Sequence, residues 1–158
     1  MVAIIEGQAA PDFELGAVNS PQTPLKLADF KGRWVVLYFY PKDMTSGCTS
    51  EAKDFQAHLE DFARHGAVVF GVSRDSLASH EKFAEKNALT FPLLSDEDGA
   101  VCEEYGVYKE KTMYGRSYMG IWRTTVLIDP EGNVAKVYPK VKVTGHVAQV
   151  LKELQKRS

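Results

Sequence analysis

The chain has 158 residues, of which 44% are hydrophobic and 25% charged, and its formal net charge is −2. This length and composition are typical of one soluble globular domain, so we expect residues 1–158 to form a single domain. The nearly balanced charge, with no cluster of lysines and arginines, argues against nucleic acid or an acidic lipid surface as a partner. No apolar run reaches the roughly 18 residues of a membrane span, so we expect no membrane partner.

The N-terminal stretch and the cysteines indicate the compartment. Residues 1–6 contain no basic segment, and their apolar run ends at Glu6, so they do not resemble a signal peptide. Cys48 and Cys102 are the chain's two cysteines, which fits a reducing compartment better than a disulfide-stabilised scaffold. We therefore expect a cytoplasmic protein.

The predicted elements alternate between strands and helices. Residues 13–30 have the character of short strands and a turn. The run over 34–40 is almost continuously apolar, which is typical of a central strand covered on both faces, and Pro41 ends it. A helix follows, whose inner face consists of residues at steps of three or four: Cys48, Ala52, Phe55, Leu59 and Phe62. Gly66 closes this helix, and a strand over 67–72 comes next.

The second half of the chain continues this alternation. The pattern predicts a helix over 76–86, a short strand over 92–94, a short helix over 98–106, strands over 124–128 and 134–138, and a helix from about 144. In the first of these helices the inner edge is expected to consist of Leu77, His80, Phe83 and Ala84. The turn over 129–133 is a strong hairpin signal. The order β-α-β-α-β-α-β-β-α predicts an α/β fold whose mixed sheet has helices on both faces.

Cys48 is expected in the first turn of the helix that follows the central strand. The free amide N–H groups and the positive dipole end at this position favour a thiolate, which is the nucleophilic form of cysteine. Thr45 is a suitable N-cap whose hydroxyl could reach the amide of Cys48, and Gly47 lets the backbone approach a small ligand closely. Position alone leaves a second interpretation open, in which Cys48 is one more small buried residue.

The surrounding residues resemble a known family. The spacing Pro41-x-x-x-Thr45-x-x-Cys48 is similar to the active-site signature of peroxiredoxins, and the preceding Phe-Tyr-Pro-Lys-Asp resembles the bacterioferritin comigratory protein, or peroxiredoxin Q, subfamily. Further similar stretches lie at residues 10–13, 27–32, 72–76, 94–96, 105–107 and 123–129. The resemblance covers nearly the whole chain. It implies a thioredoxin fold with an N-terminal extension, and an antioxidant thiol-dependent peroxidase that serves redox homeostasis.

The resemblance also implies residue roles. Cys48 would be the peroxidatic cysteine, which attacks the peroxide and becomes a sulfenic acid. Thr45 would hydrogen-bond the peroxide, and Pro41 would shield the site from water. Arg123 matches the family arginine beside the thiolate. Glu51 matches a motif position whose expected role is to orient that arginine rather than to transfer protons.

The chain departs from the subfamily in the second half of the catalytic cycle. Many members carry a resolving cysteine five residues after the first one or in the next helix, where this chain has Lys53 and Ala84. Cys102 is expected on the opposite face of the sheet as a buried structural thiol. The sequence therefore predicts a one-cysteine mechanism, with hydrogen peroxide and small organic hydroperoxides as substrates. An outside thiol would reduce the sulfenic acid: glutathione, another low-molecular-weight thiol, thioredoxin or glutaredoxin.

Other features carry weaker signals. The histidines show no ligand spacing, and no glycine-rich phosphate loop occurs, so we expect neither a metal nor another cofactor. His80 has the position of a hydrogen-bonded core histidine.

The aromatic and methionine-rich stretch at 113–122 could line the substrate mouth, form an oligomer contact or simply pack as a loop. A monomer or weak dimer is expected. The alternative functions are a thiol–disulfide oxidoreductase, against which the missing Cys-x-x-Cys argues, and a non-enzymatic peroxide sensor that passes oxidation to a partner protein.

Overall fold

The computed structural model describes residues 4–158. Of the N-terminal stretch 1–6, which is not expected to be a signal peptide, Met1–Ala3 lie outside the described residues. The strands are β1 (Glu14–Val18), β2 (Leu25–Lys26), β3 (Trp34–Phe39), β4 (Ala67–Ser73), β5 (Leu93–Ser95), β6 (Tyr108–Met113), β7 (Arg116–Ile121), β8 (Thr124–Ile128) and β9 (Val134–Tyr138). The helices are η1 (Leu27–Phe30), α1 (Ser46–Ala57), α2 (Leu59–Arg64), α3 (Leu77–Lys86), α4 (Ala100–Glu104) and α5 (His146–Arg157). Within 4–158, no helix is long and apolar enough to cross a membrane.

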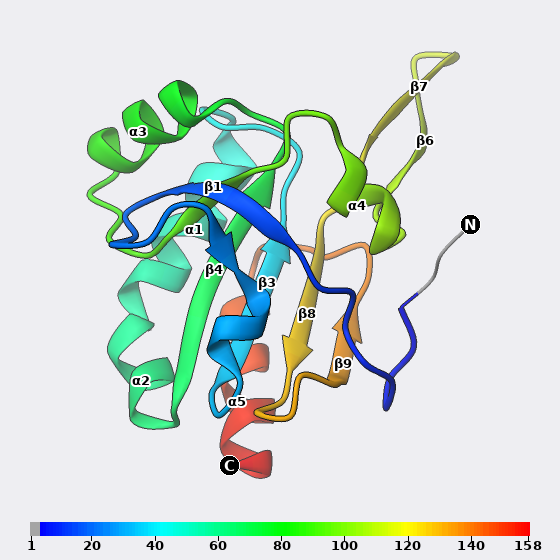
Figure 1. Cartoon of the computed structure of the whole chain (residues 1–158). Coiled ribbons are helices and arrows are strands. Elements are labelled where there is room, and N and C mark those ends of the chain that lie inside the picture. Colours follow the sequence, from blue (N-terminus) through cyan, green and yellow to red (C-terminus); the bar gives the residue numbers. More distant parts are fainter. Residues whose placement is uncertain (1–3) are drawn as a thin grey trace.

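The main sheet places β3 in its interior, between β4 and β8, as the apolar run predicts. The strand order is β2-β1-β5-β4-β3-β8-β9 (Figure 1). The pairs β3–β4 and β4–β5 are parallel, whereas β1, β8 and β9 pair antiparallel with their neighbours. Because β3 is hydrogen-bonded on both sides and covered on both faces, all its residues after Trp34 are buried. The predicted mixed sheet is confirmed.

The helices cover the two faces of the sheet unequally. On one face, α1, α2, α3 and α5 contribute to a core that contains Cys48, Phe55, Phe62, Phe83 and Val150. On the other face, α4 packs with the N-terminal segment, and this core contains Cys102. The predicted placement of Cys48 and Cys102 on opposite faces is therefore confirmed.

Two details of the predicted helices are wrong. The helix that carries Cys48 begins at Ser46 and breaks at His58, where the ring nitrogen Nδ1 lies 2.9 Å from the carbonyl oxygen of Asp54 and the backbone leaves the helical region. Leu77 is 39% exposed rather than on the inner edge, because as the first residue of α3 it lies over Gly16 at the edge of the core. Gly66 closes α2 with a φ of +71°, as expected.

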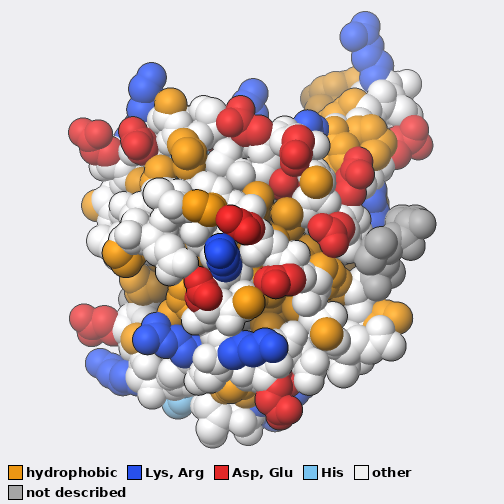
Figure 2. Space-filling view, viewed as in Figure 1, with side chains coloured by type: hydrophobic (Ala, Val, Ile, Leu, Met, Phe, Trp, Pro, Cys, Tyr) orange, Lys and Arg blue, Asp and Glu red, His pale blue; other side chains and the backbone are white. Residues whose placement is uncertain are grey.

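A hairpin formed by β6 and β7 is missing from the predicted element order. These two strands pair only with each other, and in Figure 1 they project from the sheet beyond α4. The turn residues Tyr114 and Gly115 have positive φ values of +53° and +75°, as a tight hairpin turn requires. Four large apolar side chains on this hairpin are exposed: Met113, Tyr114, Tyr118 and Met119. Figure 2 shows apolar side chains along this arm and basic side chains toward its end.

Gly71 in β4 makes room for the core aromatic residue Tyr38. The Tyr38 ring stacks on Tyr40 and Phe55, with centroid distances of 5.5 and 4.5 Å. A methyl group on Gly71 would lie 2.9 Å from Cζ and Oη of Tyr38 and 3.0 Å from Cδ2 of Leu93. Neither neighbour can move freely, since both are fully buried.

We therefore expect Gly71→Ala to lower the free energy of unfolding by about 1–3 kcal/mol, the usual cost of overpacking a core. Urea denaturation measures this change. Gly16→Ala is a matched control, because its nearest contact is the end of the exposed Leu77 side chain at 3.3 Å, which can move aside. Equal midpoints for the two variants would contradict the packing argument.

Candidate active site

Cys48 lies at the start of α1, directly after the loop that leaves the central strand. Thr45 is the N-cap residue, and α1 begins at Ser46, so Cys48 is in the first helical turn, as predicted. Its side chain is 1% exposed. Free backbone N–H groups at a helix start stabilise negative charge, and the first turn of α1 places Cys48 at this end of the helix.

The predicted side-chain cap by Thr45 is wrong. The Thr45 hydroxyl donates to the carbonyl oxygen of Lys42 at 2.8 Å, and the cap position makes no side-chain hydrogen bond to the helix. The carbonyl oxygen of Thr45 instead accepts from the amide and the hydroxyl of Thr49, at 2.9 and 2.8 Å. The hydroxyl therefore uses its single hydrogen to close the loop, and its lone pairs stay free to accept at the exposed surface.

Arg123 reaches the sulfur from the short connection between β7 and β8. Its Nη2 donates to Sγ of Cys48 at 3.4 Å, and its Nη1 donates to Oε1 of Glu51 at 2.7 Å. The backbone carbonyl of Arg123 accepts from the amide of Val141 at 2.8 Å, which fixes the connection. The structure thus brings together three of the predicted site residues. A methyl group on Gly47 would lie 3.3 Å from Nη2, so this glycine leaves room for the guanidinium.

Burial affects the protonation of the two partners of the Arg123–Glu51 ion pair differently. Burial raises the pKa of Glu51 to about 7, although the nearby Arg123 lowers it in part. Its second carboxylate oxygen has no hydrogen-bond donor among residues 4–158. For Arg123, burial alone would lower the pKa, but Glu51 and Cys48 raise it overall. The guanidinium therefore stays charged, while the carboxyl group titrates near neutral pH.

The remaining residues around Cys48 come from the loop and the hairpin. Pro41 is half-buried at the start of the loop, and Met44 is 47% exposed with a positive φ of +67°. On β6, burial and the charge of Arg123 lower the pKa of Lys111, and Cys48 offsets this in part. No sequence pattern points to Lys111, since β6 belongs to the hairpin that the element order does not predict.

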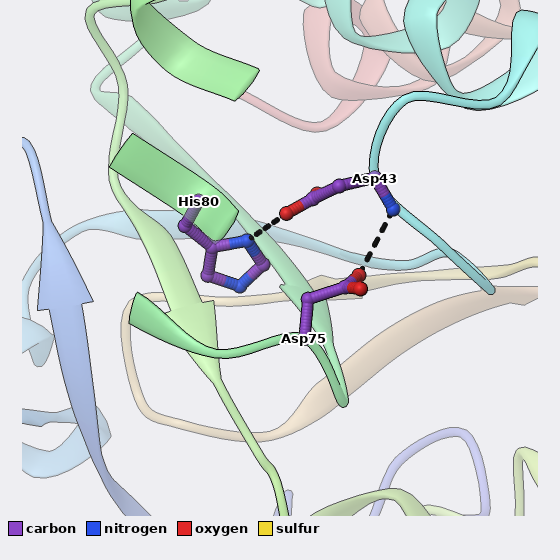
Figure 3. Close-up of side chains that lie close together, drawn as sticks. All are labelled: Asp43, Asp75 and His80. Atoms are coloured by element: carbon purple, nitrogen blue, oxygen red, sulfur yellow. Dashed lines mark hydrogen bonds and ion pairs between the residues drawn. The ribbon is translucent and has the colours of Figure 1, made fainter. Parts of the chain in front are cut away.

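One group among the described residues has the composition of a metal site. Ligand atoms of Asp43, Asp75 and His80 lie within 4.8 Å of one another, behind the loop that leads to Cys48 (Figure 3). His80 is fully buried and hydrogen-bonded, which confirms the prediction of a core histidine.

A cysteine at a helix start beside a charged arginine defines the class of protein as a thiol-based enzyme. The model of the AhpC/TSA family matches residues 6–137. Peroxiredoxin Bcp of Bacillus subtilis is 50% identical over 152 residues, which cover 96% of this chain and 96% of that protein. A putative peroxiredoxin bcp of Coxiella burnetii is 49% identical over 153 residues, covering 97% of this chain and all of the relative.

Solved structures agree with these sequence comparisons. Xanthomonas campestris peroxiredoxin Q superposes with a TM-score of 0.88 at 45% identity, covering 96% of this chain and 97% of that chain. A Xanthomonas campestris bacterioferritin comigratory protein, described for its alkyl peroxide reduction activity, superposes with a TM-score of 0.89 at 44% identity, covering 97% and 99%. The chain therefore belongs to the AhpC/TSA family, within which it is a peroxiredoxin of the Bcp and peroxiredoxin Q subfamily with a thioredoxin-like fold.

Proposed function

We propose that this thiol-dependent peroxidase reduces hydrogen peroxide and small organic hydroperoxides at Cys48 by a one-cysteine mechanism. The observation that carries the proposal is the position of Arg123, which donates to the sulfur of Cys48 and to Glu51 from one guanidinium. The alkyl peroxide reduction described for the Xanthomonas campestris relative supports organic hydroperoxides as substrates.

The proposed reaction oxidises Cys48 by two electrons. The thiolate attacks one oxygen of the peroxide, so an S–O bond forms as the O–O bond breaks, and the leaving oxygen takes up a proton to become water or an alcohol. Arg123 stabilises the negative charge that develops on the leaving oxygen. Thr45 accepts a hydrogen bond from the peroxide through its free lone pairs, and Glu51 holds the guanidinium in place. Pro41 shields the sulfur from water.

The second half of the cycle is assigned to an outside thiol. Cys102 is fully buried on the other face of the sheet, and burial followed by the charge of Asp96 holds its pKa far above the ordinary value. Such a thiol is a poor nucleophile. The outside thiol attacks the sulfenic acid, water leaves and a mixed disulfide forms, which a second thiol then cleaves. Thioredoxin, glutaredoxin or a low-molecular-weight thiol in the cytoplasm would serve.

The direct test is chemical trapping of the oxidised sulfur. The purified protein is treated with one equivalent of hydrogen peroxide and then with dimedone, and the label is located by mass spectrometry. We expect the label on Cys48 and none on Cys102. Unconsumed peroxide and an unlabelled Cys48 would refute the proposal.

A Cys102→Ser variant tests the one-cysteine mechanism. We expect steady-state peroxide consumption within about twofold of the wild type, since Cys102 is buried on the other face of the sheet and takes no part in the reaction at Cys48. Consumption is measured with excess thioredoxin and then with excess glutathione, which also separates an enzyme from a sensor that reacts once. Loss of turnover in this variant, together with an internal disulfide in the oxidised wild type, would contradict the one-cysteine mechanism.

A further inference from the structure

Asp43 and His80 form a buried pair directly behind the loop that carries Thr45. Nδ1 of His80 lies 2.7 Å from Oδ2 of Asp43, and the two side chains are 0% and 1% exposed. Figure 3 shows the His80 ring of α3 pointing toward the Asp43 carboxylate, while Asp75 approaches the backbone nitrogen of Asp43. The peroxidase chemistry proposed above uses none of these side chains.

Hydrogen-bond partners hold the His80 ring on both sides. Nε2 lies 2.9 Å from the carbonyl oxygen of Leu94, which can only accept, so Nε2 donates to it. Nδ1 lies 2.7 Å from Oδ2 of Asp43. Burial alone would raise the pKa of Asp43, but hydrogen bonds from His80 and Tyr40 lower it overall. The ring is therefore fixed between the loop that carries Asp43 and strand β5.

The remaining atoms of the cluster are also satisfied. Asp43 accepts from the hydroxyls of Tyr40 at 2.6 Å and Ser79 at 2.8 Å. Oδ2 of Asp75 accepts from the amide of Asp43 at 2.9 Å and from the hydroxyl of Ser73 at 2.6 Å. A metal ion would have to displace these hydrogens. Despite its metal-like composition, the cluster works as a hydrogen-bonded anchor.

The anchor holds a strained segment of the loop. Met44, next to Asp43, has a φ of +67°, a left-handed conformation that is unfavourable for a residue with a side chain. Asp43 is fixed through both its backbone amide and its carboxylate. These bonds set the direction of the backbone where it leads into Met44 and Thr45. The loop then closes with the bond from the Thr45 hydroxyl to Lys42, one turn before Cys48. Strain held by surrounding contacts is often a means of ordering a site in advance.

We propose that Asp43 and His80 are positioning residues, which hold Thr45 and Cys48 in the geometry that the reaction with peroxide requires. This inference rests on the proposed function of Cys48. Neither side chain touches the substrate, and their effect passes through the loop. Removing the anchor lets Met44 relax, and the Thr45 hydroxyl then moves relative to the sulfur of Cys48.

The test compares two reactions of the same sulfur in His80→Ala. Oxidation by hydrogen peroxide needs Thr45, Cys48 and the guanidinium in register, whereas alkylation by iodoacetamide needs an accessible thiolate but neither the Thr45 hydroxyl nor a placed guanidinium. We expect the second-order rate constant for peroxide to fall at least about tenfold, since small misplacements of reacting groups have large effects. The alkylation rate should change by no more than about twofold. Glu81→Ala, an exposed neighbour on α3, is the control and should leave both rates unchanged.

Substitutions of Asp43 provide the rescue. In Asp43→Asn the amide can donate to Nδ1 of a neutral His80 and still accept from Tyr40, so the loop keeps its anchor and the peroxide rate should stay within about threefold of the wild type. Asp43→Ser retains the backbone bond to Asp75 but loses the anchor, and it should behave like His80→Ala. If His80→Ala does not fold, the comparison of these two variants tests whether the Asp43 side chain positions the loop.

Three results would overturn the inference. Equal losses in oxidation and alkylation would place the defect in the thiolate, and a lower melting temperature with an unchanged peroxide rate would make the anchor a purely structural feature. Peroxide rates close to the wild type in both Asp43→Asn and Asp43→Ser would exclude a role for the side chain. A wild-type protein that does not react with peroxide would instead refute the proposed function itself, so the two failures are distinguishable.

Discussion

Replacing Arg123 with methionine is expected to slow the oxidation of Cys48 by hydrogen peroxide by about 10²–10³-fold, the usual effect of removing one donor that stabilises developing negative charge. Arg123 is only 16% exposed, and its Nη2 lies 3.4 Å from the sulfur. Methionine keeps the length and much of the apolar volume of the side chain. The loss of rate therefore measures the contribution of the positive charge and of the guanidinium N–H donors. Stopped-flow kinetics with the reduced protein measures the rate constant.

Two further variants make this prediction sharper. Arg123→Lys keeps the charge but lacks the planar fork that reaches Glu51 and Cys48 together, so we expect it to recover only part of the rate. Arg116→Met removes an exposed arginine on β7 and should have no effect. An Arg123→Met protein whose rate lies within about threefold of the wild type would show that the guanidinium does not stabilise the transition state.

The loss in Arg123→Met should be a loss of rate rather than of folding. Removing one partner of a buried ion pair usually leaves an unpaired charge and destabilises a protein strongly. Here the partner is Glu51, whose pKa is already about 7 because of burial, so the carboxyl group can take up a proton instead. Circular dichroism and thermal melts of the variant near pH 6 should therefore remain close to those of the wild type.

Much of the fold follows from local patterns in the sequence. The apolar run over 34–40 predicts the central strand β3, because only a strand covered on both faces needs so few polar residues. Proline and glycine then mark where elements end, as at Gly66. The hairpin β6–β7 carries no comparable signal, since its strands are mostly exposed on both faces and its turn is Tyr-Gly rather than Asn-Gly. An isolated hairpin buries too little to impose an alternating pattern.

Some features of the candidate active site follow from the sequence, whereas others depend on the folded chain. Helix periodicity places Cys48 in the first turn of α1, and that position is confirmed. The contact between Arg123 and Glu51 joins residues 72 positions apart, so only the family resemblance pointed to the pair. Side-chain direction escapes prediction altogether. An N-cap threonine is expected to accept from a helix amide, but in the folded loop the Thr45 hydroxyl donates to the carbonyl of Lys42 instead.

Glu51→Gln is expected to remove a large pH dependence of folding stability. Burial raises the pKa of Glu51 from 4.5 to about 7 in the folded protein, so between these values the folded state holds a proton that the unfolded state has released. Stability from this group is fully present below about pH 4.5, falls as the pH rises toward 7 and is constant above it. At about 1.4 kcal/mol for each pH unit, the loss amounts to about 3 kcal/mol.

Glutamine avoids this loss because it has no proton to release, while its Oε1 can still accept the hydrogen bond that Nη1 of Arg123 donates to Glu51. The free energy of unfolding of Glu51→Gln should therefore gain about 3 kcal/mol on the wild type between pH 4.5 and 8. Urea denaturation at several pH values measures both proteins, and Glu85→Gln, an exposed residue of α3, should follow the wild type. Parallel curves for Glu51→Gln and the wild type would mean that Arg123 compensates fully for burial. A diverging pair would mean that the protein gives up stability at neutral pH to keep a carboxylate beside the arginine.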